Sequence, residues 1–479
     1  MTAKSTRTRF APSPTGYIHV GNVRSAIYPW LLARQNGGQF IVRIEDTDRE
    51  RFVEGATELI LDTLKWLGLE WDEGPEVGGP YAPYFQSERR ETYRVWGQKL
   101  VDKGLAYADP YTTAEIEAFR VAAQAQKRPF VYRHHRPENP PAWDGTQALR
   151  FKAPDTTHYE WEDAVMGKLS ANEMVDDFIL IKSDGLPTYN FGHIIDDTEM
   201  HISHAIRGLE YIASIPKYLA LYDALGLKHP IFACLPHIMR PDGRKKLGKR
   251  DGAKSVTEYR QDGILPEAMF NFLATLGWND GTTQEIFTKD ELIAKFSLDR
   301  VQRSGARFDE KRLLWMNGQW IRSLSLDDLF ERVRDFWGEA GKTANPAYQK
   351  QVLALAQDRL KTLKDLPAVS EFFFCEPTPD WSMIDDNKQL AKLSRQQQIE
   401  FLEIAHDMLS TLNDFSADSI QNCLNNFLQA IEQKPVIGFS LIRFALTWTQ
   451  FSPDLNKSIA ILGKDKTLAR LKTAIEAGK

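Results

Sequence analysis

The chain has 479 residues, of which 42% are hydrophobic and 26% charged, and its formal net charge is −5. This composition excludes a mainly disordered, collagen-like or coiled-coil protein, and the length predicts about three domains. No apolar run approaches the ~20 residues that span a bilayer, and the first residues lack the apolar core of a signal peptide. The three cysteines are widely spaced, so neither disulfides nor structural zinc are predicted. We therefore expect a cytoplasmic protein.

The first predicted elements form a βαβ unit. A short apolar strand at 8–11 runs into a loop with two prolines and a glycine, and a buried strand follows at 39–45. Between them, apolar residues recur at the helical spacing: Val23, Ala26, Ile27, Trp30 and Leu31. Parallel pairing of the two strands follows from this order. Pro29 lies inside the helix and should kink it.

The middle of the chain alternates in the same way, with a strand at 174–181, a helix at 218–225 and a strand at 231–235. Residues 107–170 differ, because they carry prolines and short strand-like pieces, which suggests an insertion into one α/β domain. After residue 254 the apolar spacing is helical. The sequence thus predicts an α/β domain with an α+β insertion, followed by an all-α region.

Two loops carry features of phosphate binding. The segment 12–22 opens the first helix with Gly21 and His19, and helix N-termini hold phosphate well, although a plain turn with a helix cap explains the same pattern. The segment 243–250 nearly matches a P-loop but ends in Arg250 instead of a hydroxyl residue. It is either a solvated basic loop or a mobile loop whose lysines close over a polyphosphate. Between residues 240 and 260, eight Lys/Arg face three Asp/Glu.

Other polar residues group in the middle of the chain. Two readings, metal ligation or a strand end and loop with hydrogen-bonded side chains, fit the cluster His193, Asp196, Asp197, His201 and His204. Four more residues fall at or near the ends of predicted strands: Arg9, Glu45, Tyr189 and Arg207. Ligands bind at the carboxyl ends of strands in open α/β sheets, and two arginines there would suit an acidic ligand. Taken singly, each is better explained as an ordinary surface ion pair.

Several short motifs, in order along the chain, resemble those of the bacterial-type glutamyl-tRNA synthetases. They are Arg9–Gly16, His19-Val-Gly21, Arg43–Asp48, Ser183–Tyr189, Ile206–Gly208, Lys246–Arg250, and softer stretches such as Trp315–Gly318. The resemblance extends over essentially the whole chain. It implies a class I aminoacyl-tRNA synthetase that first forms glutamyl-adenylate from ATP and then transfers glutamate to tRNA.

The resemblance also implies a domain order. The expected parts are a Rossmann-like catalytic domain in two halves (1–106 and 173–255), an acceptor-stem-binding insertion (107–172), a stem-contact region (256–322) and an α-helical anticodon-binding region (323–479).

Site residues carry over position by position. Catalytic roles are implied for His19, Lys246 and Lys249. ATP binding is implied for Pro12, His19, Gly21, Asn22, Tyr211, Lys246, Lys249 and Arg250. Glutamate binding is implied for Arg9, Ala11, Ser13, Glu45, Tyr189, His193 and Arg207. Mg²⁺ would arrive with ATP, and no resident metal is implied. The implied partners are L-glutamate and tRNA(Glu), the implied state is a monomer, and Arg359 falls where an arginine selects the tRNA.

The sequence departs from the family pattern at a few positions. Gly248 replaces a serine, Asn22 a small residue, and His193 an asparagine or small polar residue. These departures keep open the alternative of a weakly active tRNA-binding paralogue. The sequence also leaves open which tRNA is charged, so an enzyme that also charges tRNA(Gln), or one directed to tRNA(Gln), is a further alternative. A glutaminyl-tRNA synthetase is disfavoured because its anticodon part is rich in β-barrels, whereas the last third here is helical. The shorter tRNA-modifying glutamyl transferases lack that third.

Overall fold

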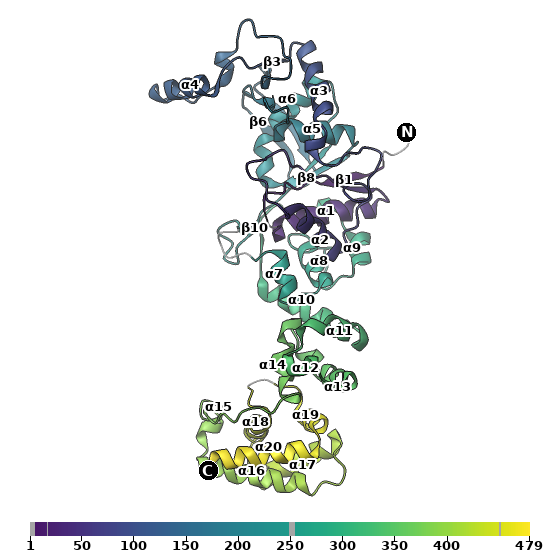
Figure 1. Cartoon of the computed structure of the whole chain (residues 1–479), viewed down its shortest axis with the longest axis vertical. Helices are drawn as coiled ribbons and strands as arrows, with labels where there is room; N and C mark the ends of the chain where they lie inside the picture. The colour runs from purple at the N-terminus through teal and green to yellow at the C-terminus, as the bar shows by residue number, and fades with distance from the viewer. Residues whose placement is uncertain (1–4, 17, 249–253, 450–451) are drawn as a thin grey trace. The chain divides into compact units, whose positions relative to one another are not determined.

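The computed structural model describes residues 5–16, 18–248, 254–449 and 452–479. The chain divides into two compact units (Figure 1). The first comprises Met1–Glu258 and Met269–Asp309, and the second comprises Tyr259–Ala268 and Glu310–Lys479.

A six-stranded sheet forms the centre of the first unit. Its order is β2 (Gln39–Val42), β1 (Arg7–Phe10), β8 (His204–Gly208), β9 (Ile231–Leu235), β5 (Tyr159–Asp163) and β6 (Gly167–Ala171). The first five strands pair in parallel, and β6 closes the edge as an antiparallel hairpin with β5. The predicted βαβ unit is confirmed: α1 (Val20–Gln35) connects β1 to β2, with Pro29 inside it.

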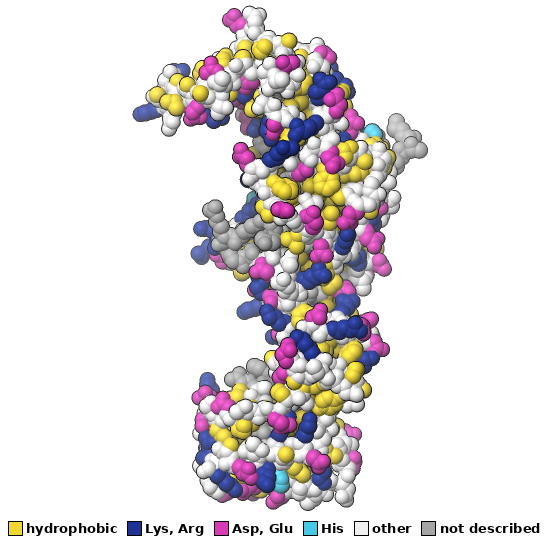
Figure 2. Space-filling model, viewed as in Figure 1, with side chains coloured by type: hydrophobic (Ala, Val, Ile, Leu, Met, Phe, Trp, Pro, Cys, Tyr) yellow, Lys and Arg dark blue, Asp and Glu magenta, His cyan; other side chains and the backbone are white. Residues whose placement is uncertain are grey.

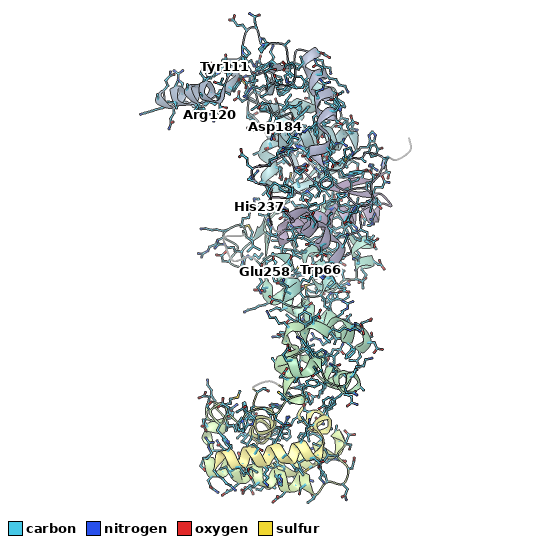
Figure 3. All side chains as sticks on the ribbon, in the orientation of Figure 1. Trp66, Tyr111, Arg120, Asp184, His237 and Glu258 are labelled. Atoms are coloured by element: carbon cyan, nitrogen blue, oxygen red, sulfur yellow. The ribbon has the colours of Figure 1, made fainter. Side chains whose placement is uncertain are left out.

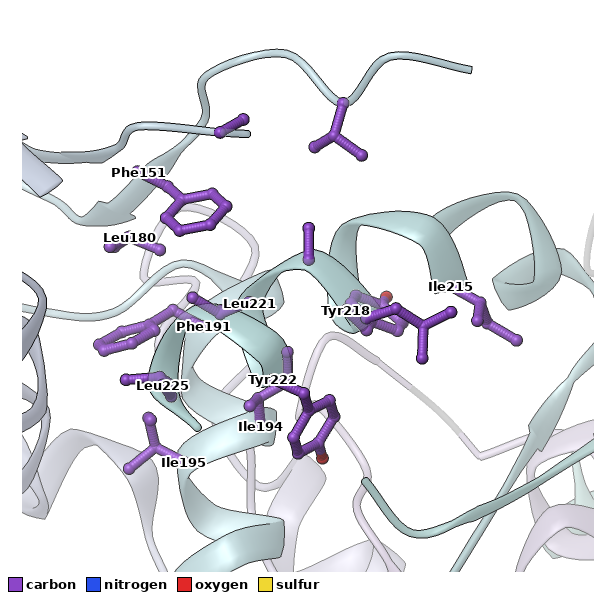
Figure 4. Packing of buried hydrophobic residues seen from close by; sticks show 14 of the residues in the cluster. Phe151, Leu180, Phe191, Ile194, Ile195, Ile215, Tyr218, Leu221, Tyr222 and Leu225 are labelled. Carbon is purple, nitrogen blue, oxygen red and sulfur yellow. The ribbon is translucent and has the colours of Figure 1, made fainter. Parts of the chain in front are cut away.

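Helices cover the sheet on two sides (Figure 1). On one side, α1 packs against β1, β2 and β8, and it also contacts α9 (Lys289–Lys295). Nearby in the chain lies α2 (Ala56–Trp66). On the other side, α3 (Arg90–Asp102), α5 (Tyr189–Glu199) and α6 (Ile215–Leu225) contribute to one apolar core (Figure 4). That core also includes Phe151 and Leu180.

The segment predicted as an insertion is divided between two sheets. A separate antiparallel sheet is formed by β3 (Ala106–Ala108), β4 (Leu149–Phe151) and β7 (Ile179–Ile181), with α4 (Thr113–Ala125) between β3 and β4. The β5–β6 hairpin instead extends the central sheet. The strand predicted at 174–181 is confined to 179–181. Asp176 and Asp177 explain the difference, because their carboxylates accept backbone and arginine N–H groups in a loop.

The remaining elements of this part of the chain are short. They are a parallel pair of strands, β10 (Ile238–Met239) and β11 (Ala306–Arg307), and the helices α7 (Val256–Gln261) and α8 (Pro266–Ala274).

The second unit is helical throughout its described residues. Its helices from 310 onward are α10 (Glu310–Ser323), α11 (Leu326–Arg332), α12 (Glu339–Lys342), α13 (Pro346–Ala356), α14 (Leu366–Ser370), α15 (Ser382–Asp385), α16 (Arg395–Ser410), α17 (Ala417–Ala430), α18 (Pro435–Thr447), α19 (Leu455–Leu462) and α20 (Lys464–Gly478). Helix α16 begins with a capping box in which Ser394 and Gln397 satisfy each other's backbone N–H groups. The predicted all-α region is confirmed.

Charged side chains of both signs are interspersed over the face shown in Figure 2. Within the part of the chain that the structure describes, no helix is both long enough and apolar enough to cross a membrane.

Candidate active site

His19 caps the first helix through its side chain. The Gly21 backbone N–H donates to His19 Nδ1 at 3.0 Å, and Asn22 Oδ1 accepts from the His19 backbone N–H at 3.4 Å. Because Nδ1 is an acceptor, the neutral ring carries its proton on Nε2. A Cβ at residue 21 would lie 2.8 Å from His19 Cε1, so only glycine fits beneath this ring. The structure thus places the His19 ring directly over the Gly21 backbone at the start of α1.

A cavity opens at this helix end, between α1, the end of β9 and the basic loop. It is lined by His19, Val20, Gly21, Asn22, Arg24, Ser25, Gly208, Glu210, Leu235, Pro236, His237, Ile238, Lys246, Leu247 and Gly248. Sequence positions as distant as 19 and 246 therefore meet at one site. Lys249 and Arg250, which were predicted to act here, lie outside the described residues.

Glu210 is the acidic partner at the mouth of this cavity. Its carboxylate lies 3.6 Å from Lys246 Nζ and 3.5 Å from His237 Nδ1. Burial, and then the nearby Lys246 ammonium, lower the pKa of His237 (labelled in Figure 3). Glu210 was missing from the predicted site residues. Its place two residues after Gly208 and one before Tyr211 was the available signal.

A second cavity contains several residues that were predicted to bind the amino acid. It is lined by Ser13, Thr15, Glu45, Thr47, Asp48, Arg49, Glu50, Arg51, Lys182, Asp184, Pro187, Thr188, Tyr189 and Tyr211. Asp184 is labelled in Figure 3. The loop before α1 is tied to this cavity, because the Glu45 backbone N–H donates to the Pro12 carbonyl at 2.9 Å. Ala11 lies next to Pro12 in that loop.

A buried ion network lies beneath this cavity. Arg43 Nη2 contacts Glu45 Oε1 at 3.0 Å, and Arg43 Nη1 contacts Asp197 Oδ1 at 2.9 Å. Asp196 is held by Arg89 at 2.7 Å. Burial raises the pKa of the Asp196 carboxyl above its usual value. For Asp197, the opposing charges of Arg9 and Arg43 outweigh burial and lower the pKa.

The structure corrects one interpretation of the polar cluster around residue 193. His193, Asp196 and Asp197 were expected at a strand end and loop, but they lie in helix α5. Their spacing of i, i+3 and i+4 puts them on one helix face, which meets buried arginines from other segments. Among the described residues, no group of three or more His, Cys, Asp or Glu side chains could hold a metal ion.

The two predicted arginines differ in their partners. Arg9 is bound bidentately by Asp197, with Nε–Oδ1 and Nη2–Oδ2 both at 3.0 Å, and its Nη1 donates to the Ile206 carbonyl at 3.2 Å. Arg207 has no carboxylate within 4 Å among the residues described, and its Nη2 atom is buried without a hydrogen bond there. Burial, and then the charge of Arg9, lower the pKa of Arg207. Arg207 therefore suits an anionic ligand, whose charge would neutralise the buried guanidinium.

Aromatic rings surround the Arg207 guanidinium. Its Cζ lies 5.2 Å from the Tyr189 ring centroid and 5.0 Å from that of Tyr211. The Tyr189 ring in turn stacks on His193, with centroids 4.9 Å apart. His193 Nδ1 lies 2.6 Å from the Tyr189 carbonyl and therefore donates to it. Burial lowers the pKa of His193 to about 4, so the ring is neutral at pH 7.

Arg359, predicted to select the tRNA, belongs to the second unit. Its Nη2 contacts Asp454 Oδ1 at 2.9 Å, and both side chains are about half exposed. Nothing in its surroundings assigns it a nucleic acid partner.

Comparison with known families accounts for most of the chain. Residues 5–315 match the family described as "tRNA synthetases class I (E and Q), catalytic domain", and residues 328–475 match "Anticodon binding domain". The chain is 41% identical over 476 residues to a protein of Dehalococcoides mccartyi named glutamate–tRNA ligase, covering 98% of this chain and 97% of the relative. A protein of the same name from Chloroflexus aurantiacus is 40% identical, with the same coverage.

Solved structures agree with these relatives. A crystal structure of a glutamate tRNA ligase from Elizabethkingia meningosepticum in complex with its amino acid is similar, with a TM-score of 0.88 and 34% identity. The match covers 99% of this chain and 100% of that one. The resemblance seen in the sequence is thus confirmed, and the chain belongs to the class I tRNA synthetase family for glutamate and glutamine (E and Q).

Proposed function

We propose that this chain attaches L-glutamate to the 3′ end of tRNA(Glu), using ATP and a glutamyl-adenylate intermediate. The observation that carries the proposal is the continuity of two sites. Gly208 and Glu210 line the cavity at the start of α1. Arg207 and Tyr211 line a small pocket next to the second cavity, and the unpaired guanidinium of Arg207 suits an anion there. A single short segment therefore joins a phosphate site to a carboxylate site. The names of the relatives support the choice of glutamate.

The first step joins the amino acid to ATP. An oxygen of the glutamate α-carboxylate attacks the α-phosphorus, the bond to the β-phosphate breaks, and pyrophosphate leaves. His19 Nε2–H and the N-terminal amides of α1 would face the phosphates, and Lys246 and Lys249 would stabilise the charge on the leaving pyrophosphate. Mg²⁺ is expected to enter with ATP. No protein nucleophile is required, because positioning and charge stabilisation lower the barrier.

The second step transfers the glutamyl group. A ribose hydroxyl of the terminal adenosine of the tRNA attacks the activated carbonyl, and AMP leaves. In the proposed domain order, the insertion at 107–172 binds the acceptor stem, residues 256–322 contact the stem, and residues 323–479 bind the anticodon. The enzyme would act as a monomer in the cytoplasm.

The amino acid is held in the second cavity in this proposal. Arg207, which lines an adjoining small pocket with Tyr211, pairs with the side-chain carboxylate, and Glu45 of the second cavity faces the α-amino group. Ser13 supplies part of the loop wall, Ala11 is proposed to lie beside it, and Arg9 is proposed as the second arginine. Because Asp197 already neutralises Arg9, Arg207 is the stronger determinant of the two.

One assay tests the proposal: labelled glutamate, ATP and purified protein are incubated separately with tRNA(Glu) and with tRNA(Gln). Charging of tRNA(Glu) alone is expected. Charging of both would establish a non-discriminating enzyme, and charging of tRNA(Gln) alone an enzyme dedicated to it. Charging of neither by a folded protein that still binds tRNA would overturn the proposal in favour of a non-catalytic paralogue, with Gly248→Ser as the first reversion to make.

A further inference from the structure

Arg207 lines a small pocket between α5, α6 and strands β8 and β9. The residues that line this pocket are His193, Asp197, Ala205, Arg207, Tyr211, Ile215, Tyr218, Tyr222, Phe232 and Cys234. Figure 4 shows Tyr218 and Tyr222 one turn apart on α6. Tyr218 is 3% exposed, and no feature of the sequence pointed to it as a functional residue.

Three buried polar atoms in this part of the fold have no hydrogen bond within the described structure. They are Arg207 Nη2, the Tyr189 hydroxyl and the Tyr218 hydroxyl. Two belong to residues that line this pocket, and the third belongs to Tyr189, which lines the second cavity. Ser214 is a polar neighbour of the Tyr218 hydroxyl, but the two groups do not reach hydrogen-bonding geometry. All three atoms can donate. A buried donor without a partner destabilises a fold, so three on side chains linked by ring contacts indicate an acceptor that arrives with a ligand.

The three side chains belong to one contiguous stack. The Arg207 guanidinium lies over the Tyr189 ring, which stacks on His193, and His193 packs edge-on against Tyr218 with centroids 4.6 Å apart. His193 donates to the Tyr189 carbonyl, and this bond fixes its orientation between the two tyrosines. His193 therefore positions Tyr218 relative to Tyr189.

The chemistry of the missing partner follows from its surroundings. Asp197 lines the pocket but is already bound by Arg9 and Arg43. The nearby Glu45 is bound by Arg43, so neither carboxylate satisfies the three donors. A carboxylate has two oxygens with about four acceptor sites and no donor, which matches a guanidinium and two hydroxyls. Hydrogen bonds to an ionised acceptor are about twice as strong as those between neutral groups.

We propose that Tyr218 is a substrate-binding residue whose hydroxyl donates to the side-chain carboxylate of the amino-acid substrate, beside Arg207 and Tyr189. This inference rests on the proposed function and adds a residue to the site. The Tyr218 bond favours glutamate over glutamine, because only glutamate offers a charged acceptor at both terminal atoms.

The test compares Tyr218→Phe with the matched control Tyr222→Phe, which changes another tyrosine of the same helix and the same pocket. Aminoacylation of tRNA(Glu) is measured first with glutamate varied at saturating ATP, and then with ATP varied at saturating glutamate. Tyr218→Phe is expected to raise KM for glutamate at least tenfold, the range for a hydrogen bond to a charged group. KM for ATP should stay unchanged, and the inhibition constant of glutamine as a competitor should rise by only about threefold.

A structural role for the hydroxyl would give different results. Removal of an unpaired buried hydroxyl is neutral or stabilising, so Tyr218→Phe should unfold at the same temperature as the wild type or higher when no substrate is present. An unchanged KM for glutamate overturns the inference. So does a rise in KM that Tyr222→Phe reproduces, or one that extends equally to ATP. A wild-type protein that charges no tRNA overturns the proposed function instead, which separates the two failures.

Discussion

Arg9 and Asp197 form a bidentate ion pair, with both nitrogen–oxygen distances at 3.0 Å and both side chains buried. Asp197 also contacts Arg43 at 2.9 Å, so one carboxylate compensates two buried guanidinium groups, one from β1 and one from the residue after β2. A residue predicted to bind substrate is thus also part of the internal framework. Its partner on α5 fixes where the arginine can reach.

Loss of this carboxylate should unfold the protein more easily. Asp197→Ala leaves Arg9 and Arg43 with less compensation, and breaking a buried pair costs about 3–5 kcal/mol. The free energy of unfolding, measured by urea denaturation, should fall by that amount. The control is Lys65→Ala, which breaks the exposed pair with Glu76 and should change stability by less than about 1 kcal/mol. Equal effects of the two variants would contradict the role assigned to Asp197.

Substitution of Gly21 should impair ATP use with little effect on stability. In Gly21→Ala the new Cβ would lie 2.8 Å from His19 Cε1, so the ring must turn away from the helix N-terminus. We expect kcat/KM for ATP to fall by about 10- to 100-fold, the loss typical of a misplaced binding group. KM for glutamate should remain close to that of the wild type. An ATP dependence equal to the wild type would show that His19 need not occupy the observed position.

The role of the basic loop can be tested at Lys246, whose position the structure describes. Lys246 lines the cavity at the start of α1, whereas its neighbour Lys245 does not. Lys246→Ala should lower the rate of adenylate formation about 100-fold, because the positive charge that stabilises the leaving pyrophosphate is lost. Lys245→Ala should have little effect. Pyrophosphate exchange in the presence of tRNA measures this step.

Lys249→Ala should likewise slow adenylate formation while tRNA binding persists. Binding is followed by a filter assay at low salt. Unchanged turnover in both Lys246→Ala and Lys249→Ala would remove the phosphate role from the loop.

The buried His193 should make the protein less stable in acid. Burial lowers its pKa in the folded state to about 4, against about 6.5 in the unfolded chain. The unfolded state therefore binds more protons between these values, and stability falls as the pH drops through 6.5 towards 4. The carboxylates of Asp197 and Glu45 oppose the shift, and Arg9 and Arg43 reinforce it.

Through this histidine alone, lowering the pH from 7.5 to 5 should reduce the free energy of unfolding by about 2 kcal/mol. Urea denaturation at both pH values, for wild type and His193→Asn, measures the difference. The variant should lose correspondingly less stability than the wild type. Identical pH dependence of the two proteins would contradict the neutral, buried state of His193.

The selectivity for tRNA should depend on Arg359. Its ion pair with Asp454 is about half exposed, so Arg359→Ala should change the free energy of unfolding by less than about 1 kcal/mol. We expect the variant to charge tRNA(Gln) in addition to tRNA(Glu), because a charged contact that opposes the wrong tRNA is removed. The ratio of kcat/KM values for the two tRNAs measures the change. A ratio equal to that of the wild type would show that Arg359 does not select between the two tRNAs.

Much of the fold was predictable because apolar spacing alone specifies it. The helix over Val23–Leu31 and the strand at 231–235 were found in this way. Helix α5 was missed because three of its buried residues are polar. His193, Asp196 and Asp197 follow a helical period, but a pattern that scores apolar residues does not register it. Their burial depends on arginines from β1 and from the segment after β2, which are distant in sequence.

The site shows the same division. His19, Gly21 and Lys246 were identified from short motifs, and they line one cavity. Tyr218 could not be found from sequence, because a tyrosine on an amphipathic helix usually serves packing. Only the complete burial of its hydroxyl without a hydrogen bond, which is a property of the folded state, points to it.

The β5–β6 hairpin, which comes from the segment predicted as the insertion, is joined to the catalytic sheet by backbone pairing with β9 and by one buried carboxylate. Asp163 accepts the backbone N–H groups of Val165 and Met166 in its own turn, and also that of Cys234 in β9, at 3.0 Å. Cys234 lines the pocket that holds Tyr218. A displacement of the hairpin is therefore transmitted to the wall of that pocket through the Asp163 side chain and through the β5–β9 pairing, so the part expected to grip the tRNA end and the part expected to select the amino acid are mechanically connected.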